Sequence, residues 1–405
     1  MAVRIRTART LEEYRLGISV IGHYFNWSPD DAEAGDFAKL IPFERTHVAV
    51  ADGSIVGGAA SFPLRLTVPG GVVPCSGVTV VGVQPTHRRQ GILSRMEDVQ
   101  LRAAREDGEP IAALWASEET IYGRFGYGMA SMMYRMRLPR HAASLLGDRG
   151  KGVTARLVDH DEALRTFPRV YARNVRRVPG LLERDRAWWT ARNLHDDSRR
   201  RRSSGPLHRV LVERDGRPIG YAMYRIALDT STGTWRKTLR VGEAMGVDDA
   251  CLLEVWRFLL SVDWMDWVEA WYLAVDHPLV LALTRVNEAE LTLFDNIWVR
   301  PVDVGTALSA RSYAAAGKTT IEVVSDPHFP DNVGLWHVEA GSVRRGRGRP
   351  DVRLPVASLG SAYLGGFSFA QLARAGRAEE ASPRGLERAD ALFRVARAPI
   401  CVETF

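Results

Sequence analysis

The sequence predicts a protein of mixed α/β and α+β domains, in which one folding pattern occurs twice before a smaller third domain. Three observations support this prediction. The chain has 405 residues, which suggests two or three domains at about 150 residues each. A pattern of strand, Asp-Gly turn, strand and glycine at residues 48–57 recurs at residues 210–220. After about residue 298, strands precede helices in an arrangement of their own.

Composition and charge favour a folded chain that binds neither nucleic acid nor a membrane interior. Hydrophobic residues make up 46% and charged residues 25% of the chain, which is ordinary for a globular protein. The net charge of +6 is modest, and no aromatic residues interleave with the arginine run at 199–202. We therefore interpret that run as a solvated loop rather than a nucleic-acid patch. No apolar run approaches the roughly 18 residues of a membrane span.

Cysteine usage indicates a reducing setting. The three cysteines, Cys75, Cys251 and Cys401, lie far apart, and none belongs to a CxxC pair. This spacing predicts no disulfide and no bound metal. The first residues lack a continuous apolar signal segment. We expect a cytoplasmic protein, although export without a recognisable signal stays open.

The first third of the chain alternates between strand and helix patterns. Asp52-Gly53 lies between two alternating apolar runs and predicts a tight hairpin. The expected strands are at 47–51, 54–60, 64–68 and 78–83. An amphipathic helix follows from Ile92 to Ala103. Its polar face is expected to carry Arg95, Glu97, Asp98 and Arg102.

The junction between the last of these strands and the helix predicts an anion site. A pyrophosphate needs convergent backbone N–H groups, the positive end of a helix and nearby cations. Gly91 lets the backbone approach closely, and Arg88 and Arg89 add charge-assisted hydrogen bonds. The alternative is a basic helix start without a ligand, which opposes the helix dipole. Asp248 and Asp249 hold this place in the second copy, so only the first copy is expected to bind an anion there.

These residues resemble motif A of the GCN5-related N-acetyltransferases, whose pattern is R/Q-x-x-G-x-G/A. Arg88 and Gly91 match it, whereas Leu93 departs from its last position. A longer resemblance, to the Eis (enhanced intracellular survival) acetyltransferase family, covers essentially the whole chain. It rests on residues 81–83, 85–91, 116–118 and 121–128.

The resemblance implies two tandem GCN5-related acetyltransferase-like domains, the second degenerate, plus a C-terminal sterol-carrier-protein-like α+β domain. The corresponding boundaries are 1–147, 148–295 and 296–405. In the last segment, we expect strands at 319–324 and 335–338 and helices at 369–374 and 389–393. The resemblance also implies assembly as a homohexamer and acetyl-CoA as the cofactor. The residues implied to bind acetyl-CoA are Val81, Gly82, Val83, Arg88, Arg89, Gln90, Gly91, Ile92, Leu93, Ser94, Ser117 and Glu118.

Acetyl transfer to an amine requires an acid and a base. A phenol with a pKa of about 10 is a plausible donor to a thiolate whose thiol pKa is about 8.5. The resemblance assigns this acid role to Tyr122; a structurally packed tyrosine is the alternative reading, and Tyr127 is the nearby rival. It assigns the base role to the terminal carboxylate of Phe405. The apolar end at 398–405 supports this role, because disordered tails are seldom apolar; a buried terminal strand with a solvated carboxylate is the alternative.

Aromatic and acidic residues between 23 and 36 suit a pocket for a polyamine cation. The family resemblance implies substrates such as aminoglycosides, acetylated at one or several amines. Cation–π contacts and ion pairs suit such a substrate. The candidate substrate residues are Tyr24, Asn26, Trp27, Asp36 and Glu403. For each acid, a solvated surface position is the alternative. A lipid or sterol carrier with a non-catalytic acetyltransferase fold is the competing function.

Overall fold

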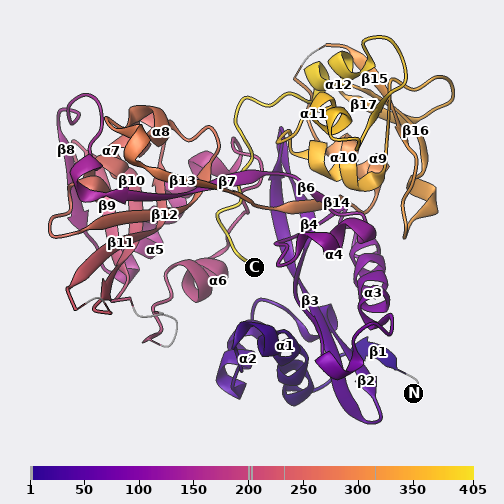
Figure 1. Cartoon of the computed structure of the whole chain (residues 1–405), viewed down its shortest axis with the longest axis horizontal. Helices are drawn as coiled ribbons and strands as arrows, with labels where there is room; N and C mark the ends of the chain where they lie inside the picture. Colours follow the sequence, from indigo (N-terminus) through magenta and orange to yellow (C-terminus); the bar gives the residue numbers. More distant parts are fainter. Residues whose placement is uncertain (1–2, 199–200, 202–203, 232, 315) are drawn as a thin grey trace. The chain divides into compact units, whose positions relative to one another are not determined.

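The computed structural model describes residues 3–198, 201, 204–231, 233–314 and 316–405 (Figure 1). Of the arginine run noted above, Arg199, Arg200 and Arg202 lie outside the described residues. By its internal contacts the chain divides into two compact units. The first unit comprises Met1–Ser131, Ile297–Ala396 and Glu403–Phe405, and the second comprises Met132–Asn296 and Arg397–Val402.

The larger sheet of the first unit orders its strands β1-β2-β3-β4-β5-β14-β6. The long strands β3 (Ser54–Val68) and β4 (Gly71–Val83) are antiparallel. The two strands expected at 54–60 and 64–68 are therefore one, which corrects the prediction. Pro63 removes only one ladder hydrogen bond, and buried residues on both sides keep the strand in the sheet. The other strands are β1 (Arg4–Thr7), β2 (Thr46–Ala51), β5 (Ile111–Leu114), β6 (Gly128–Met129) and β14 (Trp298–Pro301).

The helices of this part of the first unit begin at recognisable residues. Thr10 caps α1, and Asp30 caps α2 with a full capping box. The helix α3 buries Ile92, Met96 and Leu101 against the sheet. The helices are α1 (Leu11–Phe25), α2 (Asp31–Ala38), α3 (Ile92–Glu106) and the single turn α4 (Glu119–Tyr122).

Two strands lie in a different sheet from their neighbours in sequence. β14 inserts between β5 and β6, with Trp298 opposite Leu114 and Val299 opposite Gly128. β7 (Met132–Pro139) directly follows β6 along the chain, yet it pairs with strands of the second unit. The boundaries at residues 147 and 295 remain a proposal about segments of the sequence. In the structure, each of the two larger sheets includes one strand from beyond its boundary, β14 in the first and β7 in the second.

The second unit repeats the arrangement of the first. Its sheet runs β13-β7-β12-β11-β10-β9-β8, and the Asp-Gly hairpin expected at 210–220 joins β9 to β10. As in the first unit, the parallel strands β11 and β12 are connected through a helix, α7. The strands are β8 (Val153–Leu157), β9 (His208–Arg214), β10 (Arg217–Asp229), β11 (Arg236–Gly246), β12 (Trp267–Ala274) and β13 (Glu290–Asp295). The helices are α5 (His160–Val175), α6 (Arg186–Trp188), α7 (Asp249–Ser261) and α8 (Pro278–Ala282).

A smaller sheet, ordered β17-β16-β15-β18-β19, completes the first unit. The strands and helices predicted for this segment are present as β15, β16, α11 and α12, and their core includes Trp336 and Phe369. In the part of the chain that the structure describes, every helix is too short or too polar to cross a bilayer. The strands are β15 (Lys318–Val323), β16 (Gly334–Glu339), β17 (Ser342–Arg345), β18 (Val352–Leu354) and β19 (Glu379–Glu380). The helices are α9 (Val304–Ala310), α10 (Val356–Tyr363), α11 (Phe369–Arg374) and α12 (Gly385–Phe393).

Candidate active site

A cavity of about 790 Å³ lies in the first unit, beside the point where β4 and β5 separate. The two strands are paired only as far as Gly77 and Ala113. β4 then continues to Val83, whereas β5 ends at Leu114. The end of β4, the start of α3 and the residues after β5 line the cavity.

The cavity brings together the predicted acetyl-CoA residues with the single exception of Gln90, which is exposed on the same loop. Tyr122 and Tyr24 line the same cavity. The acetyl-CoA candidates that line it are Val81, Gly82, Val83, Arg88, Arg89, Gly91, Ile92, Leu93, Ser94, Ser117 and Glu118.

The start of α3 is open to an anion. Gly91 is the N-cap residue, at φ 74°, and no side chain among the described residues caps this helix. The first-turn amides therefore lack the side-chain acceptor that Thr10 provides for α1. Arg88 and Arg89 are exposed beside this turn, and the Arg88 guanidinium carbon lies 5.9 Å from the centre of the Tyr24 ring. Donors and positive charge thus converge at a helix start that no carboxylate caps among the described residues, which is the environment that binds a diphosphate.

Tyr122 and Tyr127 differ in their access to the cavity. Their rings meet edge to face, with centroids 6.0 Å apart. Tyr122 lines the cavity and is 8% exposed, whereas Tyr127 is fully buried behind it. Burial, together with the neighbouring Glu97, raises the pKa of both phenols above the ordinary value. Both tyrosines are therefore protonated throughout the neutral range.

Glu97 was expected on the polar face of α3, and the structure corrects this expectation. Its side chain is 0% exposed because it shares a buried stripe of the helix with Leu93 and Leu101, which pack in the same cluster as Tyr122 and Tyr127. Neither carboxyl oxygen has a hydrogen-bond partner among the described residues. Burial raises the pKa of this group from 4.5 to about 7, with Arg300 and Arg124 opposing the shift. The helical periodicity of the sequence could not predict that Glu97 is buried, because a charged residue is ordinarily assigned to the solvent-facing side of a helix.

Replacing Glu97 with methionine is expected to stabilise the protein more as the pH rises. Below about pH 4.5 the Glu97 carboxyl is neutral in both the folded and the unfolded protein. Between about pH 4.5 and 7 it loses its proton in the unfolded chain but keeps it in the folded protein, so the free energy of unfolding falls as the pH rises. Above pH 7 the wild-type protein bears the full penalty of about 3 kcal/mol. Urea unfolding of both proteins at pH 5 and pH 8 measures this difference. An equal difference at the two pH values would contradict the raised pKa.

The C-terminal residues lie against the same strands. The Trp115 indole N–H donates to the carbonyl of Glu403 at 2.7 Å. The Phe405 ring meets Phe62 edge to face, with centroids 6.3 Å apart. A Cβ built on Gly77 would lie 3.3 Å from a ring carbon of Phe405. Because Gly77 is the last residue of β4 that pairs with β5, the Phe405 ring lies where β4 and β5 separate.

The predicted substrate residues fall into different surroundings. Trp27 begins an aromatic row, since its ring centroid is 5.5 Å from that of Phe37, which is 6.4 Å from that of Phe62. This row ends at Phe405. Trp27 is thus linked by ring contacts to the chain terminus. The sequence offered no sign that Phe37 and Phe62 would join them, because those contacts depend on the folded sheet.

The other substrate candidates have identifiable partners. Asn26 ends α1 at φ 50°, and its backbone N–H donates to the Gly22 carbonyl. Asp36 pairs with Lys39 at 2.8 Å on the surface. Glu403 is 5% exposed, and the Tyr24 hydroxyl donates to the Val83 carbonyl at 2.8 Å. Tyr24 therefore lies beside the predicted acetyl-CoA residues, and Asn26 has a structural role at a helix end.

The corresponding place in the second unit has the opposite charge. β11 and β12 are paired as far as Val241 and Ala270, as β4 and β5 are paired before they separate. The loop of residues 84–91 is reduced here to residues 247–248. Asp248 caps α7 by accepting from the Cys251 N–H at 2.8 Å. A protein carboxylate therefore already occupies the start of this helix, as Asp248 and Asp249 led us to expect.

Family models describe three parts of the chain. Residues 4–130 and residues 180–300 each match an acetyltransferase (GNAT) domain, and residues 304–402 match a sterol carrier protein domain. N-acetyltransferase Eis of Mycobacterium tuberculosis is 34% identical over 386 residues, which cover 90% of each chain. The chain belongs to the Eis family of N-acetyltransferases. The resemblance stated from the sequence is therefore confirmed.

Other members of the Eis family and their relatives agree. An N-acetyltransferase of Streptomyces avermitilis is 36% identical over 359 residues, covering 87% of each chain. The crystal structure of Eis1 from Mycobacterium abscessus superimposes with a TM-score of 0.86 at 32% identity, covering 99% of this chain and 100% of that chain. The predicted fold class of two acetyltransferase domains and a sterol-carrier-like domain is confirmed, and the chain is an N-acetyltransferase.

Proposed function

We propose that this Eis-family enzyme transfers the acetyl group of acetyl-CoA to primary amines of a polyamine-like cation such as an aminoglycoside, at one or several positions. One observation carries the proposal. A single unit holds an uncapped helix start beside two arginines, a tyrosine at the cavity wall and the chain terminus at the separation of β4 and β5.

The residues around the cavity fit acetyl-CoA, which supplies an activated acetyl thioester when bound. The first-turn amides of α3 and the side chains of Arg88 and Arg89 are suited to its diphosphate. Val81 to Val83 form the cavity wall at the end of β4, where the rest of the cofactor would lie. A cavity of about 790 Å³ is within the range of ligand pockets.

Two groups of this chain move protons in the proposed mechanism. The terminal carboxylate of Phe405 accepts a proton from the substrate amine. Its ordinary pKa is about 3.5, so it needs partial removal from water, or a relaying water, to act as a base. The Phe62 ring, which meets the Phe405 ring, supplies apolar surface in this region. Tyr122 Oη donates its proton to the departing thiolate sulfur. Its raised pKa keeps Tyr122 in the protonated form that this role requires.

The substrate side of the proposal rests on the aromatic row from Trp27 to Phe405. Aromatic faces attract ammonium groups, and Asp36 and Glu403 add negative charge for a polycation. The family resemblance further supports our proposal of a homohexamer, and the scattered cysteines support our proposal of a cytoplasmic protein.

A panel of amines tests the proposed activity. The protein is incubated with acetyl-CoA and aminoglycosides, diamines or lysine peptides, and thiol release is followed over time. We expect turnover with the polycationic amines. Failure with every amine, combined with uptake of a fluorescent lipid, would favour the carrier function instead.

Replacing Arg88 or Arg89 with methionine is expected to weaken acetyl-CoA binding by about 10-fold, because a charge-assisted hydrogen bond to the diphosphate is lost. Titration calorimetry measures the Kd. Arg102→Met is the matched control, since Arg102 is exposed on α3 and pairs with Asp98 outside the cavity. An equal loss in the control would mean that the arginines act only through net charge.

A further inference from the structure

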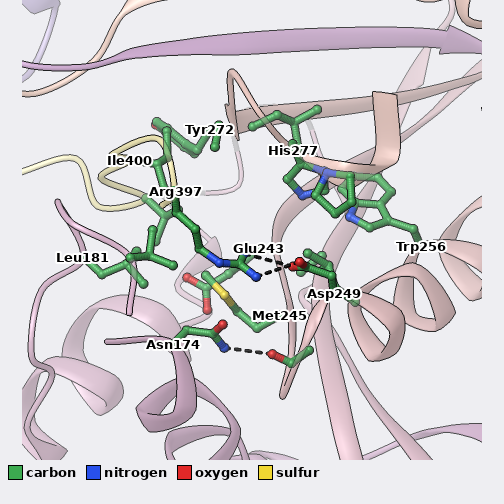
Figure 2. Close-up of a pocket in the computed structure, with 18 of the residues that line it drawn as sticks. Asn174, Leu181, Glu243, Met245, Asp249, Trp256, Tyr272, His277, Arg397 and Ile400 are labelled. Atoms are coloured by element: carbon green, nitrogen blue, oxygen red, sulfur yellow. Dashed lines mark hydrogen bonds and ion pairs between the residues drawn. The ribbon is translucent and has the colours of Figure 1, made fainter. Parts of the chain in front are cut away.

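The C-terminal segment Arg397–Val402 forms part of the lining of a pocket in the second unit (Figure 2). The pocket is formed by β11, β12 and the start of α7, which is the arrangement that forms the cavity of the first unit. Figure 2 shows the Arg397 guanidinium reaching Asp249, in the first turn of α7. The two hydrogen bonds of this ion pair measure 2.9 and 2.6 Å.

Further hydrogen bonds fix the backbone of this segment. The Ala398 N–H donates to Asp276 Oδ2 at 2.8 Å, and the Ile400 N–H donates to the Pro179 carbonyl at 2.9 Å. Asn296 holds Cys401 by both backbone groups, at 2.8 and 2.9 Å, and both residues are 0% exposed. The segment is therefore bound along its length rather than at one point.

Gly180 is suited to this close approach of the tail. A Cβ built there would lie 2.8 Å from the Ile400 carbonyl oxygen, and the residue has φ +94°, which strains other side chains. Ile400 is 5% exposed and is one of the residues that line the pocket. The surface of the second unit thus fits the backbone and the side chains of the tail.

Charge distinguishes the two helix starts. In the first unit, Arg88 and Arg89 lie beside the uncapped turn of α3. In the second unit, Asp248 and Asp249 occupy the start of α7, and the cation Arg397 binds there. The second site has therefore lost the features that bind a diphosphate and gained those that bind the chain's own tail.

We propose that the surface of the second unit that binds residues 397–402 is a dock that positions the terminal carboxylate, with Arg397, Asp249 and Asn296 as positioning residues. The inference rests on the proposed function, because it assigns the base role to Phe405. The chain passes from the second unit to the first between Val402 and Glu403. Docking of residues 397–402 leaves only three residues to be ordered at the site, which reduces the conformational entropy lost there.

The tail variant Arg397→Met/Ile400→Ala tests the dock in the full-length protein. Two quantities report on the dock, the rate at which carboxypeptidase A releases Phe405 and kcat, and the Kd for acetyl-CoA is measured as a control. Release is expected to become about 10-fold faster and kcat about 10-fold lower, because the tail samples more conformations. The Kd for acetyl-CoA stays unchanged, because no dock residue lines the first-unit cavity.

Two further variants separate docking from general damage. Arg394→Met removes a positive charge from an exposed residue just before the dock, and we expect wild-type values for both quantities. Arg397→Lys keeps the positive charge but loses the two-pronged hydrogen bonding to Asp249, so it should restore only part of the turnover that Arg397→Met alone loses.

Unchanged release of Phe405 from the double variant would overturn the dock. Faster release of Phe405 with unchanged kcat would also overturn the proposal. The second unit would then hold the tail, but the terminal carboxylate would not act as the base. That second result would also remove the base from the proposed function, so the two failures are distinguishable.

Discussion

Removal of Phe405, or addition of a few residues after it, is expected to lower kcat by at least about 100-fold, the usual contribution of a general base. Both changes move the terminal carboxylate away from the point where β4 and β5 separate, which the Phe405 ring now contacts at Gly77. The Kd for acetyl-CoA should not change, because the cavity walls come from the strands, loop and helices of the first acetyltransferase domain. Steady-state thiol release and calorimetry measure the two quantities.

Phe405→Leu is the matched control for this prediction. The variant keeps a terminal carboxylate on the same backbone and loses only the ring contact with Phe62. We expect it to retain far more activity than the extended chain. An extended protein that turns over as fast as the wild type would exclude the carboxylate as the base.

Tyr122→Phe is expected to lower kcat by about 100-fold while sparing the Kd for acetyl-CoA, because the donor for the departing thiolate is lost and the ring remains. Tyr122 is the tyrosine of its cluster that reaches the cavity wall. The raised pKa of its phenol predicts that kcat shows no basic decline from this group in the neutral range. Rates measured from pH 6 to pH 9 check both statements.

Tyr127→Phe provides the comparison for Tyr122. Its hydroxyl is buried and has no hydrogen-bond partner among the described residues, so its removal should cost little activity. If Tyr127→Phe lost as much activity as Tyr122→Phe, the acid role would pass to Tyr127 or to the pair. If neither variant lost activity, water would be the better proton source.

Local patterns in the sequence predicted much of the fold and most of the residues that line the first-unit cavity. The Asp52-Gly53 hairpin, its repeat at 210–220 and the loop from Arg88 to Gly91 each depend on residues close together in the chain. Short-range turn chemistry and helix periodicity describe such features well. This explains why the residues of one loop and one strand end were found to line one cavity.

The features that the sequence did not reveal depend on contacts between distant residues. β14 enters the first sheet beside Leu114, although more than 180 residues separate the two strands. Glu97 is buried because Tyr122 and Tyr127 pack over its side of α3, which periodicity along one helix cannot show. Arg397 pairs with Asp249. From the sequence, the charge of Asp249 indicated only that this helix start would not bind an anion. Each of these features depends on how helices and strands pack together. Sequence patterns identify those elements only one at a time.

A crystal structure of the protein with bound acetyl-CoA tests the central claim most directly. We expect the diphosphate to lie against the first-turn amides of α3 at Gly91, between Arg88 and Arg89, with the Phe405 carboxylate facing the acetyl group. A diphosphate held elsewhere, or a terminus turned away from the acetyl group, would contradict it.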